Sequence, residues 1–256
     1  MVEGAKSVLI AGAGGGFDIY AGLPLFFWLR SMGITVHLSN LSFSDLSYVA
    51  GQNPVSALTI VHANSTAPSR YFPEGHLAAW LAQNGIHTPI HAISRVGGAE
   101  VAEAYEWIAQ SLQPDTIILV DGGTDILMRG DEAGLGTPQE DIASLAAVVG
   151  LSGVERKLIA CLGFGIDTHH GVCHANFLEN VSALIEEGGF LGSWSLMREM
   201  HEFQMYEAAC AFAHAQQPNS KSIVNSSIIA SGNGWFGDRH PTARTEGSTL
   251  KKQLKP

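Results

Sequence analysis

The sequence has few charged residues, and basic residues are the scarcer kind. Charged residues make up 15% of the 256 residues and hydrophobic residues make up 46%. That composition excludes an intrinsically disordered chain and predicts a large buried core. The 14 basic residues against 24 acidic residues give a formal net charge of −10. Because an acidic surface gains nothing from a phosphate backbone, no nucleic acid is expected as a partner.

Cysteine is also scarce, and patterns that direct a chain to a membrane are missing. Cys161, Cys173 and Cys210 are odd in number and form no CxxC pair, which favours a reduced compartment. No basic amphipathic helix and no signal peptide pattern is found. The apolar stretch at residues 8–29 contains Asp18 and several glycines, which argues against a membrane span. The sequence therefore predicts a cytoplasmic protein without a membrane partner.

Strand-like apolar runs alternate with helix-like segments along the chain. Strands are predicted in "SVLIAGA", "ITVHLS", "ALTIVHA", "HTPIHAIS", "DTIILVDGG", "RKLIACLGFG" and "SIVNSSIIAS". Helices are predicted in "PLFFWLRSMG", "PEGHLAAWLAQNG", "TPQEDIASLAAVVG" and "HANFLENVSALIEEGG", and over residues 99–112 and 193–215. This order predicts an α/β protein: a three-layer α/β/α sandwich with a mostly parallel, Rossmann-like doubly wound sheet. Residues 1–256 are expected to form a single domain.

The first strand-like run leads into a glycine-rich segment that carries one carboxylate, Asp18. Glycine lets backbone N–H groups approach an anion closely, so this segment is predicted to bind a phosphate or another anionic group. The predicted ligand-binding glycines are Gly12, Gly14, Gly15 and Gly16. Asp18 is predicted to contact the ligand or a metal, and a helix N-cap is an equally supported interpretation.

The same segment matches the dinucleotide-binding fingerprint GxGxxG only in part. Phe17 stands at the position of the third glycine, and the next strand, in "VHLSN", ends without a carboxylate for a ribose hydroxyl. No lysine follows the glycines, so the segment is not a Walker A loop. A metal-free enzyme with NAD as cofactor is therefore the weaker alternative.

A second glycine-rich segment, residues 119–141, follows another apolar strand and carries several carboxylates. Asp121 stands at the strand tip, and Asp125 follows in the same loop. Carboxylates gathered at strand tips commonly hold Mg²⁺ or Mn²⁺, which in turn bind phosphate. The predicted metal ligands are Asp18, Asp121 and Asp125, and the predicted ligand-binding residues of this segment are Gly122, Gly123 and Arg129.

The other carboxylates of that segment have a structural interpretation. Asp131 and Glu132 fit a solvated acidic loop as well as they fit a site. The pattern at Thr137–Glu140 predicts a capping box at the start of the next helix, and Asp141 is favourable beside the positive end of the helix dipole.

The third unusual segment is "GFGIDTHHGVCH", residues 163–174, after the predicted strand "RKLIACLGFG". Its carboxylate and imidazole groups can bind a transition metal or supply a general acid or base near neutral pH. The spacing fits neither the HExxH helix nor a zinc finger. Any one histidine is more often structural, but the cluster favours function. The predicted catalytic residues are Asp167, His169, His170 and His174.

Several of these blocks together resemble a known family. "AGAGGGFD", "VDGGTDILMRGDEAGLGTPQED", "GFGIDTHHGVCHANFLENVSALIEEGGFLG" and "SIVNSSI" resemble the prokaryotic domain of unknown function 1152 family over nearly the whole chain. The resemblance implies an α/β domain and carries no established activity. The family's glycine stretch typically reads GGGGD, so Phe17 replaces a glycine here.

Two classes of function follow from these segments. The first is an enzyme that carries out metal-assisted hydrolysis or group transfer on a nucleotide-like or phosphorylated small molecule. The alternative is a non-catalytic nucleotide or dinucleotide sensor that uses the same glycine loop. Metal-dependent turnover distinguishes the two, and a homodimer is the default expectation for a protein of this kind.

Overall fold

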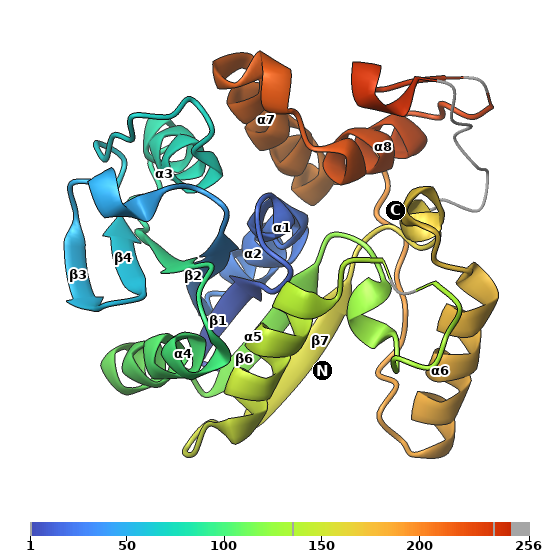
Figure 1. The fold of residues 1–256 in the computed structure, drawn as a ribbon, viewed down its shortest axis with the longest axis horizontal. Coiled ribbons are helices and arrows are strands. Elements are labelled where there is room, and N and C mark those ends of the chain that lie inside the picture. The colour runs from blue at the N-terminus through green and yellow to red at the C-terminus, as the bar shows by residue number, and fades with distance from the viewer. Residues whose placement is uncertain (1, 135, 238, 247–256) are drawn as a thin grey trace.

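The computed structural model describes residues 2–134, 136–237 and 239–246, and its centre is one seven-stranded sheet (Figure 1). The strands lie in the order β3-β4-β5-β2-β1-β6-β7. Strands β1, β2, β5, β6 and β7 are parallel, and β4 is antiparallel to both of its neighbours. The strand bounds are β1 Ser7–Gly12, β2 Thr35–Ser42, β3 Gln52–Val55, β4 Leu58–Val61, β5 Ile90–Ser94, β6 Thr116–Asp121 and β7 Arg156–Cys161.

Two hydrophobic clusters, one on each face of the sheet, hold the layers together. Side chains of β1 alternate between them, with Val8 and Ile10 in the first cluster and Leu9 and Ala11 in the second. Such a strand is buried on both faces, which explains its uninterrupted apolar sequence. The predicted α/β class is thereby confirmed.

The helices are divided between the two faces of the sheet. Helices α1 (Asp18–Ala21), α2 (Leu23–Ser31), α3 (Pro73–Gln83), α7 (His201–Gln216) and α8 (Ile223–Gly232) contribute to the first cluster. Helices α4 (Gly98–Leu112) and α5 (Gln139–Gly150) contribute to the second. This arrangement matches the predicted doubly wound, three-layer sandwich.

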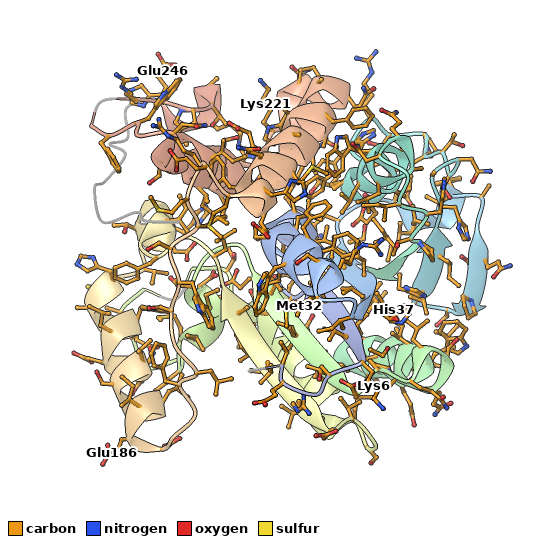
Figure 2. The ribbon with its side chains drawn as sticks, turned by 180° about the vertical axis from the view of Figure 1, so that it is seen from behind. Lys6, Met32, His37, Glu186, Lys221 and Glu246 are labelled. Carbon is orange, nitrogen blue, oxygen red and sulfur yellow. The ribbon has the colours of Figure 1, made fainter. Side chains whose placement is uncertain are left out.

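Helix α6 (His174–Glu186) projects away from the sheet, with Glu186 at its far tip (Figure 2). The short 3₁₀ helices are η1 Leu46–Tyr48, η2 Asp125–Leu127, η3 Ile166–His170, η4 Pro218–Ser220 and η5 Ala243–Thr245. Among the described residues, no helix combines the length and the apolar character needed to cross a bilayer.

One predicted element is wrong in type, and another forms a hairpin with a strand that was not predicted. The run "SIVNSSIIAS", predicted as a last strand, forms helix α8. Its start is fixed by the side chain of Ser222, which accepts a hydrogen bond from the backbone N–H of Asn225. The run "ALTIVHA" forms β4 as predicted, but it enters the sheet antiparallel as the second strand of a hairpin whose first strand, β3, was not predicted.

Three further expectations need correction. The predicted buried strand at "RKLIACLGFG" is the half-exposed edge strand β7. Helix α7 begins at His201, so residues 193–200 are not helical. Helix α5 has Pro138 at its N-cap with no side-chain cap bond, so the Thr137–Glu140 capping box is absent.

The order of the strands places a switch point between β1 and β6, where sheets of this class have a crevice beyond the strand ends. The chain passes from β1 to β2 on one side and from β6 to β7 on the other, so the connections diverge at this point. In open α/β sheets, ligands bind at such a switch point, beyond the carboxyl ends of the strands. The fold thus directs attention to the segments that follow β1 and β6.

Gly12, at the end of β1, has no room for a side chain. A Cβ atom there would overlap Oδ1 of Asn40 and lie 2.6 Å from the backbone nitrogen of Ile19. Gly12→Ala is expected to lower the free energy of unfolding by at least about 2 kcal/mol, because Asn40 and the backbone of α1 already fill the space around Gly12. Urea unfolding followed by circular dichroism measures the change.

Gly150→Ala is the matched control, because a Cβ atom on Gly150, at the end of α5, meets nothing within 4 Å. It should change the free energy of unfolding by no more than about 1 kcal/mol. Equal stability of the two variants would show that Gly12 is not tightly packed.

Candidate functional site

Asp18 and Asp121 come together at the crevice between β1 and β6. Asp121 is the last residue of β6, and Asp18 is the first residue of α1, after the glycine loop that follows β1. The backbone N–H of Gly122 donates to Oδ1 of Asp18 over 3.3 Å, which links the two segments. The N-cap of α1 is Phe17 rather than Asp18, so the side chain of Asp18 is not used as a helix cap.

A third carboxylate, Asp141, joins them from the first turn of α5. One oxygen of each of Asp18, Asp121 and Asp141 lies within 4.8 Å of one oxygen of both others. We call these three residues the carboxylate cluster. Gly14 permits the approach, because a Cβ atom there would lie 2.6 Å from Oδ2 of Asp141 and 2.8 Å from Oδ2 of Asp18.

The carboxylate cluster is mostly buried. Asp121 and Asp141 are 3% and 2% exposed, whereas Asp18 is partly exposed. Among the described residues, the ion pairs involve none of these three carboxyl groups. Oδ1 of Asp141 is buried and has no hydrogen-bond partner. A buried carboxylate oxygen without a partner is costly, so the cluster requires a proton or a cation.

The pKa values of these groups show the same need for a proton or a cation. Burial, with the negative charge of Asp125, raises the pKa of Asp18 to about 8. Burial and the charge of Asp18 raise the pKa of Asp141 to about 9. Burial and the charge of Asp141 raise the pKa of Asp121 well above its ordinary value. In the absence of a cation, Asp18 and Asp141 retain protons at neutral pH.

Asp125 and Asp167 lie next to the carboxylate cluster, and both are buried. Asp125 was predicted as a metal ligand, but its Oδ2 accepts a 2.8 Å hydrogen bond from the backbone N–H of Thr137. Oδ2 of Asp167 accepts hydrogen bonds from the backbone N–H and the hydroxyl of Thr124. These bonds fix both carboxyl groups around the cluster.

The three predicted histidines have different surroundings. Nδ1 of His170 lies 3.7 Å from Oδ1 of Asp167, and this carboxylate raises the pKa of His170. His174 is the first residue of α6 and packs edge-on against the ring of Phe164, with the ring centroids 6.2 Å apart. The side chain of His169 lies outside the described part of the chain. Among the members of this group whose side chains are described, Asp167 and His170 form a pair beside the carboxylates.

The glycine loop lies beside the carboxylate cluster. Gly15 and Gly16 have φ of +96° and +63°, values that favour glycine. The backbone N–H of Gly16 donates to the carbonyl of Leu41 over 3.1 Å, and that of Gly14 bonds to the carboxylate of Asp18. Because these two amides are already used, the predicted phosphate cradle in this loop remains a prediction.

The other predicted ligand-binding residues lie on the loop after β6. Gly122 donates to Asp18, and Gly123 lies against Asp167, where a Cβ atom would come within 2.7 Å of Oδ2. Arg129 is exposed, and its backbone N–H donates to Glu132 over 2.9 Å. Its predicted ligand contact therefore remains a prediction.

Asp141 is the residue that the sequence analysis missed as a cluster member. It was interpreted as a surface carboxylate favoured by the dipole of the helix that it begins. The signal that could have identified it is its place in the loop-to-helix connection after β6, because ligands bind beyond the carboxyl ends of the strands in such sheets. Its burial against Gly14 depends on how α5 packs over the sheet.

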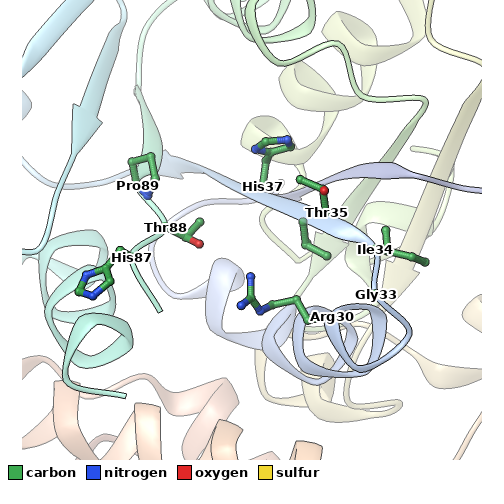
Figure 3. A pocket seen from close by; sticks show the side chains of 9 residues that line it. Arg30, Gly33, Ile34, Thr35, His37, His87, Thr88 and Pro89 are labelled. Atoms are coloured by element: carbon green, nitrogen blue, oxygen red, sulfur yellow. The ribbon is translucent and has the colours of Figure 1, made fainter. Parts of the chain in front are cut away.

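A cavity of appreciable volume lies elsewhere. It has a volume of about 420 Å³ and is lined by residues from the end of α2 and from the amino ends of β2 and β5, including Arg30, His37 and His87 (Figure 3). Ligand sites in sheets of this kind lie at the carboxyl ends of the strands. The carboxylate cluster therefore remains the candidate site.

The raised pKa values predict how stability depends on pH without metal. The unfolded chain releases the Asp18 and Asp141 protons near 3.8, whereas the folded protein holds them until about 8 and about 9. Between these limits the folded state binds more protons, so its free energy of unfolding falls as pH rises from about 4 to about 9. Urea unfolding in excess EDTA at pH 5, 7 and 9 measures this slope.

Asp141→Asn should flatten that slope and be more stable than the wild-type protein at pH 9, because the amide carries no charge. Asp131→Asn is the matched control, since Asp131 is exposed. A slope in Asp141→Asn as steep as that of the control would contradict the raised pKa.

Comparisons with known proteins give a family and a distant structural likeness. The model of the family described as "Protein of unknown function (DUF1152)" matches residues 9–210. No curated protein matches the sequence. The solved N,N'-diacetylchitobiose deacetylase from Pyrococcus horikoshii is similar over 86% of this chain and 82% of its own, with 15% identity and a TM-score of 0.30. The family match covers more than half of the sequence, and the chain belongs to the DUF1152 family.

Proposed function

We propose that this protein is a metal-dependent enzyme that hydrolyses or transfers a group of a nucleotide-like or phosphorylated small molecule. Asp18, Asp121 and Asp141 would hold Mg²⁺ or Mn²⁺. The observation that supports this most directly is the convergence of three carboxyl groups, one of them with a buried oxygen that lacks a partner. Carboxylate oxygens are the ligands that both hard cations prefer.

The exposure of the cluster suits catalysis better than a purely structural ion. Asp121 and Asp141 are buried, while Asp18 is partly exposed. A cation held in this way keeps ligand positions free for water or for a substrate. When bound, such a cation polarises a substrate oxygen or activates a water molecule.

Asp167 and His170 would supply the proton transfer. Asp167 is held by Thr124, and its free oxygen, Oδ1, faces Nδ1 of His170. This carboxylate favours the imidazolium form, so His170 is protonated to a higher pH than an ordinary histidine. A protonated imidazole at the mouth of a metal site can donate its proton to a leaving group.

Metal binding is the first test of the proposal. Chelator-treated protein is titrated with Mn²⁺, and free Mn²⁺ is followed by electron paramagnetic resonance. Asp141→Asn should weaken binding at least tenfold, because it replaces a buried charged ligand. Asp131→Asn should bind as the wild-type protein does. Unchanged binding by Asp141→Asn would refute the metal site.

A ligand panel then separates an enzyme from a sensor. Thermal unfolding is measured with nucleotides and sugar phosphates, with and without Mg²⁺ or Mn²⁺. A stabilising ligand that requires the metal and is consumed on incubation supports the enzyme. A ligand that stabilises the protein without metal and is recovered unchanged supports the sensor.

The Asp167–His170 pair has its own test. Asp167→Asn removes the negative charge that raises the pKa of His170, so that pKa should fall toward the ordinary value for histidine. Histidine proton signals followed by NMR between pH 5 and 9 measure the shift, with Asp131→Asn as the control. An unshifted titration of His170 would remove the pair from the mechanism.

A further inference from the structure

We propose that Arg95 binds a phosphate group of the substrate beside the cation of the carboxylate cluster. The proposal rests on the metal-dependent function above and narrows its substrates to those that carry a phosphate. Arg95 follows β5, and it belongs to none of the segments that the sequence analysis selected.

A series of contacts through Phe43 and the glycine loop links Arg95 to the candidate site. Gly14 lies against the carboxylate oxygens of Asp18 and Asp141, and the next residue, Gly15, lies against the ring of Phe43. A Cβ atom on Gly15 would come within 2.6 Å of Cε1 of that ring. The guanidinium carbon of Arg95 lies 5.3 Å from the centroid of the same ring. Arg95 is therefore stacked on a ring that packs against Gly15, the residue next to the one that contacts Asp18 and Asp141.

A second contact links Arg95 to α5, the helix that carries Asp141. Nη1 of Arg95 lies 3.8 Å from Oε1 of Glu140, the residue that precedes Asp141. The aromatic ring and the carboxylate together restrict the rotamers of Arg95, so less entropy is lost when a ligand binds. Its side chain is 64% exposed, and its remaining donors are accessible from solvent.

The charges of the site explain why such a residue is needed. An anion that approaches three carboxylates is repelled unless a cation neutralises them. A cation that is shared among three carboxylates still leaves the site negative, so a substrate anion needs a further positive group. Arg95 would supply that group from its position beside Phe43 and Glu140.

The geometry favours a phosphate over a carboxylate. A phosphate monoester has three free oxygens, so one can bind the metal while two accept the parallel N–H bonds of a guanidinium fork. A carboxylate has only two oxygens, so one of them would have to accept an N–H bond and bind the metal at the same time. The ligand class that fits both groups together is a phosphate ester.

The experiment uses inorganic phosphate as the probe and Mn²⁺ as the metal. The ³¹P relaxation of phosphate, enhanced by bound Mn²⁺, is titrated with wild-type protein, Arg95→Gln and Arg95→Lys. Arg95→Gln should weaken phosphate binding about tenfold or more, the usual effect of losing charged hydrogen bonds. Arg95→Lys should be intermediate, because it keeps the charge and loses the fork.

The controls separate this proposal from the metal site. Arg198→Gln removes an exposed arginine that pairs with Glu199 elsewhere, and it should bind phosphate as the wild-type protein does. Mn²⁺ affinity should be unchanged in Arg95→Gln. If Mn²⁺ binds but phosphate affinity in Arg95→Gln stays within twofold of wild type, the role of Arg95 is wrong and the metal site stands.

Two other outcomes would also overturn the proposal. If acetate binds to the Mn²⁺ form as tightly as phosphate does, the phosphate class is wrong. If the wild-type protein binds no Mn²⁺, both the metal site and the phosphate contact beside it are wrong.

Discussion

Three carboxyl groups that meet in a buried crevice cannot all be negative without compensation. In this protein the carboxylate cluster joins Asp18, Asp121 and Asp141, and the ion pairs of the described residues leave all three out. Like charges at such distances repel strongly where water is excluded, so either protons or a cation must be bound. The raised pKa values describe the protein with bound protons, and the proposed metal ion is the alternative.

The fold brings these groups together at the one place where its connections diverge. β1 and β6 are neighbours in the sheet although more than a hundred residues separate them in the chain, and Asp18 and Asp121 follow their carboxyl ends. The α5 helix packs over the same crevice, and Gly14 leaves space for Asp141. Each of these features destabilises the fold, and the apolar clusters on the two faces of the sheet offset that loss of stability. The arrangement is easier to explain as a ligand site than as a contribution to stability.

Much of this arrangement follows from the sequence. The apolar runs of β1 and β6 and the glycines after them predict a doubly wound sheet with Asp18 and Asp121 at strand tips. Asp141 could not be predicted in the same way, because helix dipoles favour aspartate in the first turn whether or not it is buried. The sequence analysis also predicted the wrong type of element for α8. Its β-branched residues are typical of a strand, whereas the hydrogen bond to the Ser222 side chain marks the start of a helix. Tertiary packing decides both cases.

The most direct measurement is anomalous diffraction from crystals grown with Mn²⁺ after chelator treatment. The account predicts a strong anomalous peak within bonding distance of one carboxylate oxygen from each of Asp18, Asp121 and Asp141. It also predicts that the peak is lost in Asp141→Asn crystals grown in the same way. A map with no peak at the crevice between β1 and β6, from crystals in which the three side chains are well ordered, would contradict it.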